Sequence, residues 1–161
     1  GGLSAEIDID TMQRAFVNVI TETVFYENKV HLTEKTFKPI VAKMPFLMFA
    51  GAGNLEYLKR YGFKTFSSVI DESYDSIQDN DQRIQAVVEQ LQWYCNLSPI
   101  RKDQIIKHLE PTIEHNFQHF YGDFKYVITH ELITNIKELY KTLEISDSHI
   151  NYEFIFHALT K

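Results

Sequence analysis

Five consecutive apolar residues, Phe46 to Ala50, lie between Pro45 and Gly51, and this run constrains the fold more than any other feature of the sequence. An apolar run of this length without a polar position is typical of a strand that is buried on both faces. The segment 16–21 is also apolar and β-branched, and the segment 63–66 has a similar short pattern. We therefore predict short strands in these three places.

Helical patterns separate the predicted strands. Thr33 is a good helix N-cap, and Glu34 follows it in the first turn, where a negative charge is favourable. Asn54 is a good N-cap for a second, shorter helix, which Gly62 is placed to end. Strands that alternate with helices form parallel sheets with helices on their faces. The fold class predicted for residues 14–75 is therefore α/β, with a Rossmann-like parallel sheet and flanking helices.

The second half of the chain, residues 79–161, has the pattern of helices almost throughout. Pro111 is expected to interrupt or restart one of them, because proline removes a backbone donor. We predict a single domain over residues 1–161, whose mainly helical part covers one face of the sheet or packs on a partner domain. The clearest amphipathic helix has apolar residues at Leu132, Ile133, Ile136, Leu139, Tyr140 and Leu143.

The composition excludes several classes of protein. The chain has 161 residues, a formal net charge of −6 and 44% apolar residues, which is ordinary for a globular domain. A negative net charge gives no general attraction to nucleic acid. No apolar run approaches the roughly eighteen residues of a membrane span. Cys95 is the only cysteine, which fits the reducing cytoplasm, where we expect the protein.

The stretch 22–40 carries the densest set of polar side chains, around a strand end and a helix start. Ligands of open parallel sheets bind beyond the carboxyl ends of the strands. A helix N-terminus at that edge offers N–H groups and a partial positive charge to an anion. Glu34 supplies acceptors for ribose or sugar hydroxyls, and Lys29, Lys35 and Lys38 supply cations for a diphosphate. The pattern therefore predicts a site for a nucleotide sugar.

Three segments resemble the donor-binding motif of the α1,3-fucosyltransferase family: Phe25–Asn28, His31–Lys35 and Pro45–Gly51. The family shows a Phe-x-x-Glu-Asn segment, then Tyr-Val-Thr-Glu-Lys at the start of a helix, then a small apolar strand. The resemblance implies half of a GT-B fold, in which the second of two Rossmann-like domains holds most of the nucleotide sugar. It implies a hexosyl or fucosyl transfer in which the nucleoside diphosphate sugar is the donor and no metal or other cofactor is required.

The resemblance also implies which residues bind the donor. Glu34 and Lys35 would contact the ribose, the sugar or the phosphates, and Glu27 and Asn28 would shape the pocket, while His31 stands where the family has Tyr. No catalytic residue is predicted, because we expect the base on an N-terminal acceptor-binding domain elsewhere in a longer protein. The predicted substrate-binding residues are Glu27, Asn28, His31, Thr33, Glu34, Lys35 and Lys38.

A second hypothesis assigns the chain no catalytic role. The segments 54–66 and 71–75 are similar to uncharacterised proteins of phage or marine microbial type. In a phage or bacterial assembly the same α/β core would serve as a scaffold. The aromatic C-terminal helices of the chain would then provide a self-association surface for a homo-oligomer.

Two further groups of residues allow alternative interpretations. His115 and His119 lie one helical turn apart, as metal-binding histidines can, so a metal-dependent hydrolase is a third hypothesis, although a helix surface is favoured there. Asp71, Glu72 and Asp75 offer oxygen ligands for a cation, but the stretch has no loop template for one. We favour loop and N-cap roles for these three carboxylates.

Overall fold

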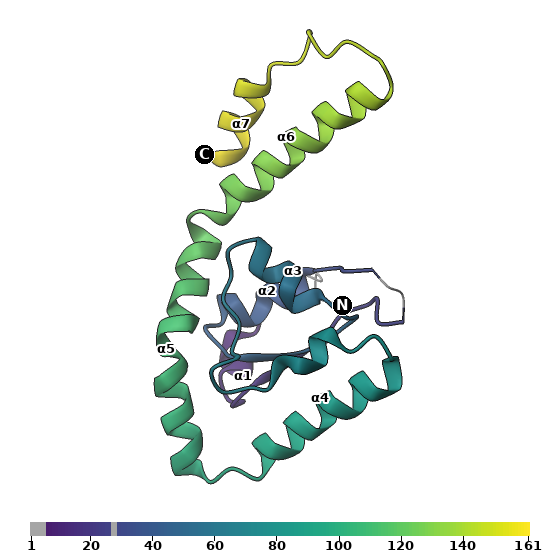
Figure 1. Ribbon diagram of the computed structural model, residues 1–161. Coiled ribbons are helices and arrows are strands. Elements are labelled where there is room, and N and C mark those ends of the chain that lie inside the picture. The colour runs from purple at the N-terminus through teal and green to yellow at the C-terminus, as the bar shows by residue number, and fades with distance from the viewer. Residues whose placement is uncertain (1–5, 27–28) are drawn as a thin grey trace. The chain divides into compact units, whose positions relative to one another are not determined.

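The computed structural model describes residues 6–26 and 29–161 (Figure 1). The chain divides into two compact units, the first ending at Phe117 and the second comprising Gln118–Lys161. The boundary between the units lies at residue 117, far from the predicted boundary between residues 75 and 79, and the single domain stays a prediction.

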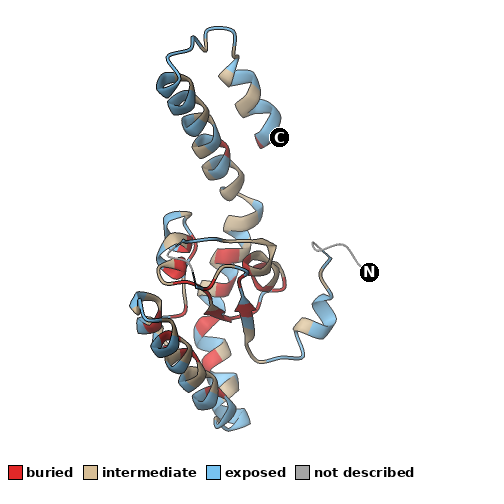
Figure 2. Cartoon of the chain, turned by 90° about the vertical axis from the view of Figure 1, so that its right-hand side faces the viewer, coloured by how far each residue is buried: buried red, intermediate tan, exposed pale blue. Residues whose placement is uncertain are grey.

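The first unit contains a parallel two-stranded sheet joined by a helix. Strand β1 (Asn18–Thr21) pairs with β2 (Phe46–Phe49), with Asn18 opposite Phe46 and Thr21 opposite Phe49. Helix α2 (Glu34–Val41) connects them. Leu47 and Met48 are fully buried, and Figure 2 shows buried residues gathered around the two strands. The α/β class and the parallel pairing are therefore confirmed.

The prediction of a third strand at residues 63–66 is wrong. The backbone of this segment bonds to side chains and pairs with neither strand of the described sheet. The Asn116 amide accepts from the Lys64 N–H and donates to the Lys64 carbonyl, both at 2.8 Å. The Glu72 carboxylate accepts from the Phe66 N–H at 2.7 Å. These side chains satisfy the backbone groups that a ladder would otherwise use.

Short elements complete the α/β core: α1 (Ile9–Met12), α3 (Asn54–Arg60) and the 3₁₀ helix η1 (Glu72–Ser76). Asn54 does not cap α3 as predicted. Gly53 takes the cap position with a φ of 84°, a conformation that favours glycine. The buried Asn54 amide instead donates to the Gly51 carbonyl at 2.7 Å, so it fixes the turn before the helix.

Two long helices follow in the same unit, α4 (Asn80–Cys95) and most of α5 (Pro99–Tyr121). The predicted interruption at Pro111 is wrong, because α5 runs through it. Proline costs the helix one hydrogen bond, but burial of the helix face opposes that cost. The buried apolar residues of α5 are Ile105, Leu109 and Ile113.

The second unit contains a pair of helices, α6 (Phe124–Thr142) and α7 (Tyr152–Thr160). They pack together, with the rings of Tyr126 and Phe156 stacked at 6.2 Å between centroids. The aromatic C-terminal segment thus packs on α6, although Phe154 is 69% exposed. Within the described ranges, no helix combines the length and the apolarity needed to cross a bilayer.

Candidate functional site

The carboxyl end of β1 meets the start of α2, as the sequence predicts, but a buried carboxylate occupies the junction. Glu22 directly follows β1 and is only 6% exposed. Its Oε1 accepts from the Thr33 N–H at 3.0 Å and from the Thr36 hydroxyl at 2.6 Å. Its Oε2 accepts from the Thr33 hydroxyl at 2.7 Å. The protein's own carboxylate thus takes the place next to the helix that we had assigned to a diphosphate.

The next amides of α2 are also used internally. The Thr33 hydroxyl accepts from the Lys35 N–H at 3.2 Å, which confirms Thr33 as the N-cap, and the Thr33 carbonyl accepts from the Thr36 N–H at 3.1 Å. An anion placed at roughly 4 Å from the Glu22 carboxylate would be repelled by about 4 kcal/mol at an effective dielectric constant of about 20. The expectation that this turn is open to a diphosphate is therefore corrected.

The first-turn side chains stand at the surface beside this junction. Those of Glu34 and Lys35 are 37% and 39% exposed, and they lie 3.7 Å apart between Oε1 and Nζ. The Lys35 ammonium also donates to the Thr23 hydroxyl at 3.2 Å, so it reaches back across the end of β1. Both predicted residues remain accessible to a ligand.

The remaining predicted site residues lie in different surroundings. The His31 backbone N–H donates to the Asn54 side chain at 2.9 Å, and the residue is exposed. Lys38 lies one turn after Lys35 on α2. Glu27 and Asn28 lie outside the described residues.

A depression of about 180 Å³ lies between β1 and the side of α2. Lys35 and Lys38 both line it, so the structure brings together two of the predicted cationic residues. Asn18 and Val19 form part of the opposite wall, on β1.

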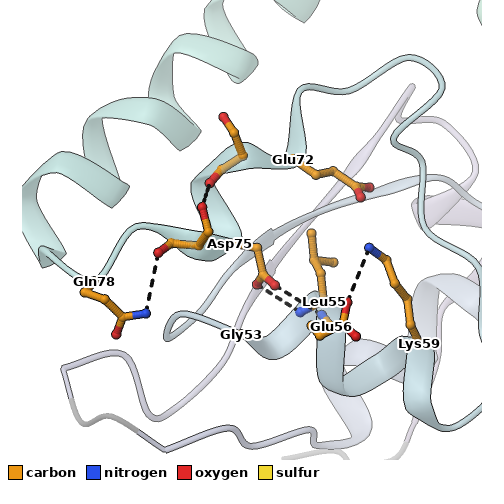
Figure 3. Close-up of a pocket in the computed structure, with 9 residues that line it drawn as sticks. Gly53, Leu55, Glu56, Lys59, Glu72, Asp75 and Gln78 are labelled. Carbon is orange, nitrogen blue, oxygen red and sulfur yellow. Dashed lines mark hydrogen bonds and ion pairs between the residues drawn. The ribbon is translucent and has the colours of Figure 1, made fainter.

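A larger cavity, of about 430 Å³, lies between α3 and η1 (Figure 3). The Asp75 carboxylate caps α3, accepting from the N–H groups of Leu55 at 2.9 Å and Glu56 at 3.1 Å. Asp71 accepts from the Ser73 N–H at 3.0 Å and caps η1. The predicted N-cap role is confirmed for Asp71, whereas Asp75 lies within η1 and binds the first N–H groups of α3 from another segment.

Glu72 also lines this cavity, and burial raises the pKa of its carboxyl. Hydrogen bonds from Thr65 and Phe66 and the charge of Lys59 oppose that shift. Because burial is the largest of these effects, the Glu72 carboxyl is protonated more easily than that of an exposed glutamic acid. Because Glu72 also holds the Phe66 backbone, we assign it to the structure of the 63–76 segment.

The sequence gives little sign of Arg83, which is 2% exposed within the first unit. Burial lowers the pKa of its guanidinium, and the centre of the guanidinium lies 4.5 Å from the centroid of the Phe25 ring. It joins segments that are far apart in the chain, through hydrogen bonds of 2.6 to 3.3 Å to the carbonyls of Phe25, Ala50, Ile77 and Gln78 and to the Asn80 side chain.

The burial of Glu22 and Arg83 was not predicted, although the sequence carries a weak signal for each. Glu22 is two residues beyond the buried Ile20, so the strand period places it on the same face. Arg83 lies one helical turn before the buried Val87 and therefore shares the inner face of α4. In both places the hydrophobic pattern predicts burial, although the residue type argues against it.

No cluster of three or more potential metal-ligating side chains occurs in the part of the chain that the structure describes. The His115 ring lies 3.0 Å from the Gly62 carbonyl oxygen, so it takes part in the packing of α5. Comparison of the chain with profiles of protein families, with curated proteins and with solved structures finds no match.

Proposed function

We propose that this chain is the donor-side half of a glycosyltransferase, with a Rossmann-like core of the GT-B kind, and that it acts in the cytoplasm. The donor would be a nucleoside diphosphate sugar, bound at the carboxyl end of β1. Parallel β–α–β units bind their ligands at that edge of the sheet. The confirmed β1–α2–β2 unit supports this placement.

One observation carries the proposal. The Lys35 ammonium lies at the end of β1, 3.2 Å from the Thr23 hydroxyl, and its side chain is 39% exposed. A half-exposed ammonium at this edge can pair with a phosphate without first losing a buried partner. Because the Glu22 carboxylate already binds the N-cap residue Thr33, the charge of Lys35, rather than the helix amides, would neutralise the diphosphate.

The proposed chemistry divides between two parts of the enzyme. A base on the acceptor-side domain removes the proton of an acceptor hydroxyl, and the acceptor oxygen forms a bond to the anomeric carbon of the sugar. The bond from that carbon to the diphosphate breaks, and the diphosphate leaves with the electron pair. Lys35 stabilises the negative charge that develops on this leaving group.

Calorimetric titration with UDP, GDP and their sugars tests the proposal. We expect one of these nucleotides to bind the chain with a dissociation constant below millimolar. Lys35→Met should weaken that binding about tenfold, since a charge-assisted hydrogen bond is lost. The matched control is Lys107→Met, which removes an exposed lysine of α5 and should leave the affinity unchanged. The absence of any binding tighter than millimolar would end the donor-half proposal.

A specific observation also favours the second candidate, a self-association module. Three apolar residues of α6 and its C-cap residue Leu143 are between 43% and 56% exposed, and at 3.6 residues per turn they lie within an arc of about 60°. This exposed stripe consists of Ile128, Leu132, Leu139 and Leu143. A contiguous exposed apolar surface commonly marks a protein–protein contact.

The spacing of the exposed stripe suits a second copy of the same helix. Ile128 and Leu143 are equally distant from a point between residues 135 and 136, and so are Leu132 and Leu139. Two antiparallel copies of α6 related by a two-fold axis can therefore set Ile128 against Leu143 and Leu132 against Leu139. Such self-complementarity is what a two-fold symmetric interface requires.

Leu139→Lys should convert this dimer to a monomer, because it places a charge in the apolar contact. Thr134→Lys is the matched control, since it adds the same charge at an exposed position of α6 outside the stripe. Light scattering at several protein concentrations measures both. A wild-type chain that is monomeric throughout, or a dimer that tolerates Leu139→Lys, contradicts the association module.

A further inference from the structure

A cavity of about 480 Å³ is lined by residues of α4, of α5 and of the segment 68–69. The two helices follow each other through the short turn 96–98 (Figure 1), and every lining residue belongs to the first unit. Cavities that hold a whole small ligand span roughly 300–1,000 Å³. The size therefore suits a complete small molecule, and the proposed function makes no use of this place.

Helix α5 contributes one side of the cavity. Arg101, Gln104, Ile105 and His108 all line it, and at 3.6 residues per turn they lie within an arc of about 100°. Ile105 is 4% exposed and holds this side of the helix against the core, whereas the three polar side chains around it are exposed. The cavity thus combines an apolar surface with groups that form hydrogen bonds.

Trp93 contributes an aromatic surface from α4. The residue is 39% exposed, and its ring packs edge to face on Tyr94 with 4.9 Å between the centroids. Tyr94 is itself 2% exposed, so the core holds the indole in place. The indole N–H makes no hydrogen bond to any residue that the structure describes. A fixed, half-exposed tryptophan offers a ligand a broad apolar face and one free donor.

The charge of the cavity is positive. Among the described residues that line it, Arg101 carries the one permanent charge, and none is a carboxylic acid. Within the same part of the chain the guanidinium makes one hydrogen bond, from Nη1 to the neutral Gln104 Oε1 at 3.2 Å. A guanidinium has five N–H donors in a planar fork that matches a carboxylate. The remaining donors of Arg101 can therefore hold one carboxylate of a ligand.

The other polar groups of the cavity suit hydroxyls. The Ser68 hydroxyl, the Gln104 amide and the His108 ring each offer both a donor and an acceptor, as a ligand hydroxyl does. Ser68 and His108 have no side-chain hydrogen bond to the described residues. A sugar ring carries C–H groups on its face and hydroxyls along its edge, whereas a flat aromatic acid would leave these polar groups without partners.

We propose that this cavity binds a sugar acid, a pyranose ring that carries a carboxylate. The C–H face of the ring packs on Trp93, and the carboxylate pairs with Arg101. The hydroxyls bond to Ser68, Gln104 and His108. The inference does not rest on the proposed function, because none of these residues belongs to the proposed donor site.

The test uses the fluorescence of Trp93, which is the only tryptophan of the chain and therefore reports on this cavity alone. Glucuronate should change the emission in a saturable way, with a dissociation constant of about 1 mM, as expected for so small a ligand. Neutral glucose should bind about tenfold more weakly, because it lacks the charge-assisted pair with Arg101.

Three variants assign the contacts. Arg101→Met should weaken glucuronate binding about tenfold, to the level of glucose, and should leave glucose binding unchanged. Arg60→Met is the matched control, since it removes an exposed arginine of α3 outside the cavity, and it should change neither affinity. Trp93→Leu should weaken the binding of both sugars about tenfold, measured by saturation-transfer NMR of the ligand. Thermal melts check that each variant folds.

The outcomes decide both the site and the ligand class. Emission that stays unchanged at about 20 mM glucuronate overturns the site. Equal affinities for glucuronate and glucose, or an equal loss in Arg60→Met and Arg101→Met, overturn the role of Arg101. Benzoate that binds more tightly than glucuronate overturns the sugar in favour of a flat aromatic acid. Lys35→Met should leave glucuronate binding unchanged, so this inference and the donor proposal stand or fall separately.

Discussion

Arg83→Met is expected to lower the free energy of unfolding of the first unit by about 4 kcal/mol. Hydrogen bonds to charged groups contribute about 1.5–3 kcal/mol each, and buried acceptors that lose their donor add a further cost. The guanidinium donates to carbonyls of three segments, around Phe25, Ala50 and Ile77. Methionine fills a similar volume but leaves these acceptors without donors. Thermal unfolding followed by circular dichroism should show a fall in the melting temperature of about 15 °C.

Two further variants make the Arg83 result specific. Arg83→Lys keeps the charge but loses the planar fork that reaches several carbonyls at once, so it should recover little of the stability. Arg101→Met removes an exposed arginine that bonds to Gln104, and it should change the stability by no more than about 0.5 kcal/mol. If Arg83→Met proves as mild as Arg101→Met, the buried guanidinium does not hold these segments together.

Glu22→Ala is expected to lower the free energy of unfolding by about 3 kcal/mol, because it leaves three donors from two threonines without an acceptor. Glu22→Gln should cost less, about 1–2 kcal/mol, since the amide oxygen still accepts from part of this set. Glu110→Ala, at an exposed position of α5, is the control and should change the stability by no more than about 0.5 kcal/mol. Urea titration measures all three variants.

The same Glu22 variants separate structural from electrostatic effects on binding. Glu22→Gln removes a negative charge beside the proposed phosphate position, so pyrophosphate should bind this variant more tightly than the wild type even though the fold is less stable. A loss of affinity that simply follows the loss of stability would contradict the assignment of Glu22 as the group that repels anions from the cap of α2.

Local patterns predicted the parts of the fold that depend on local chemistry. The apolar run at β2 and the cap at Thr33 are decided by residues next to one another, and both were predicted correctly. The segment 63–66 has the pattern of a strand, but its pairing was decided by Asn116, 52 positions away from Lys64. Long-range contacts of this kind leave no periodic signal in the sequence.

The positions of the residues in the candidate site were predictable to a similar degree. Its place at the end of β1 and the residues Lys35 and Lys38 follow from the pattern of strand, cap and helix. The occupation of the cap by Glu22 does not follow, because it depends on how the strand end meets α2 in space. The sequence therefore indicates where a ligand could bind but does not show which donors the protein already uses.

Amide chemical shifts of the isotope-labelled chain, recorded during titration with UDP and GDP, test the placement of the donor most directly. The proposal predicts concentration-dependent shifts at Val19, Thr21, Thr23, Lys35 and Lys38, with α6 and α7 unaffected. Shifts confined to residues around Glu72 and Asp75, or no shift at all at millimolar nucleotide, would contradict it.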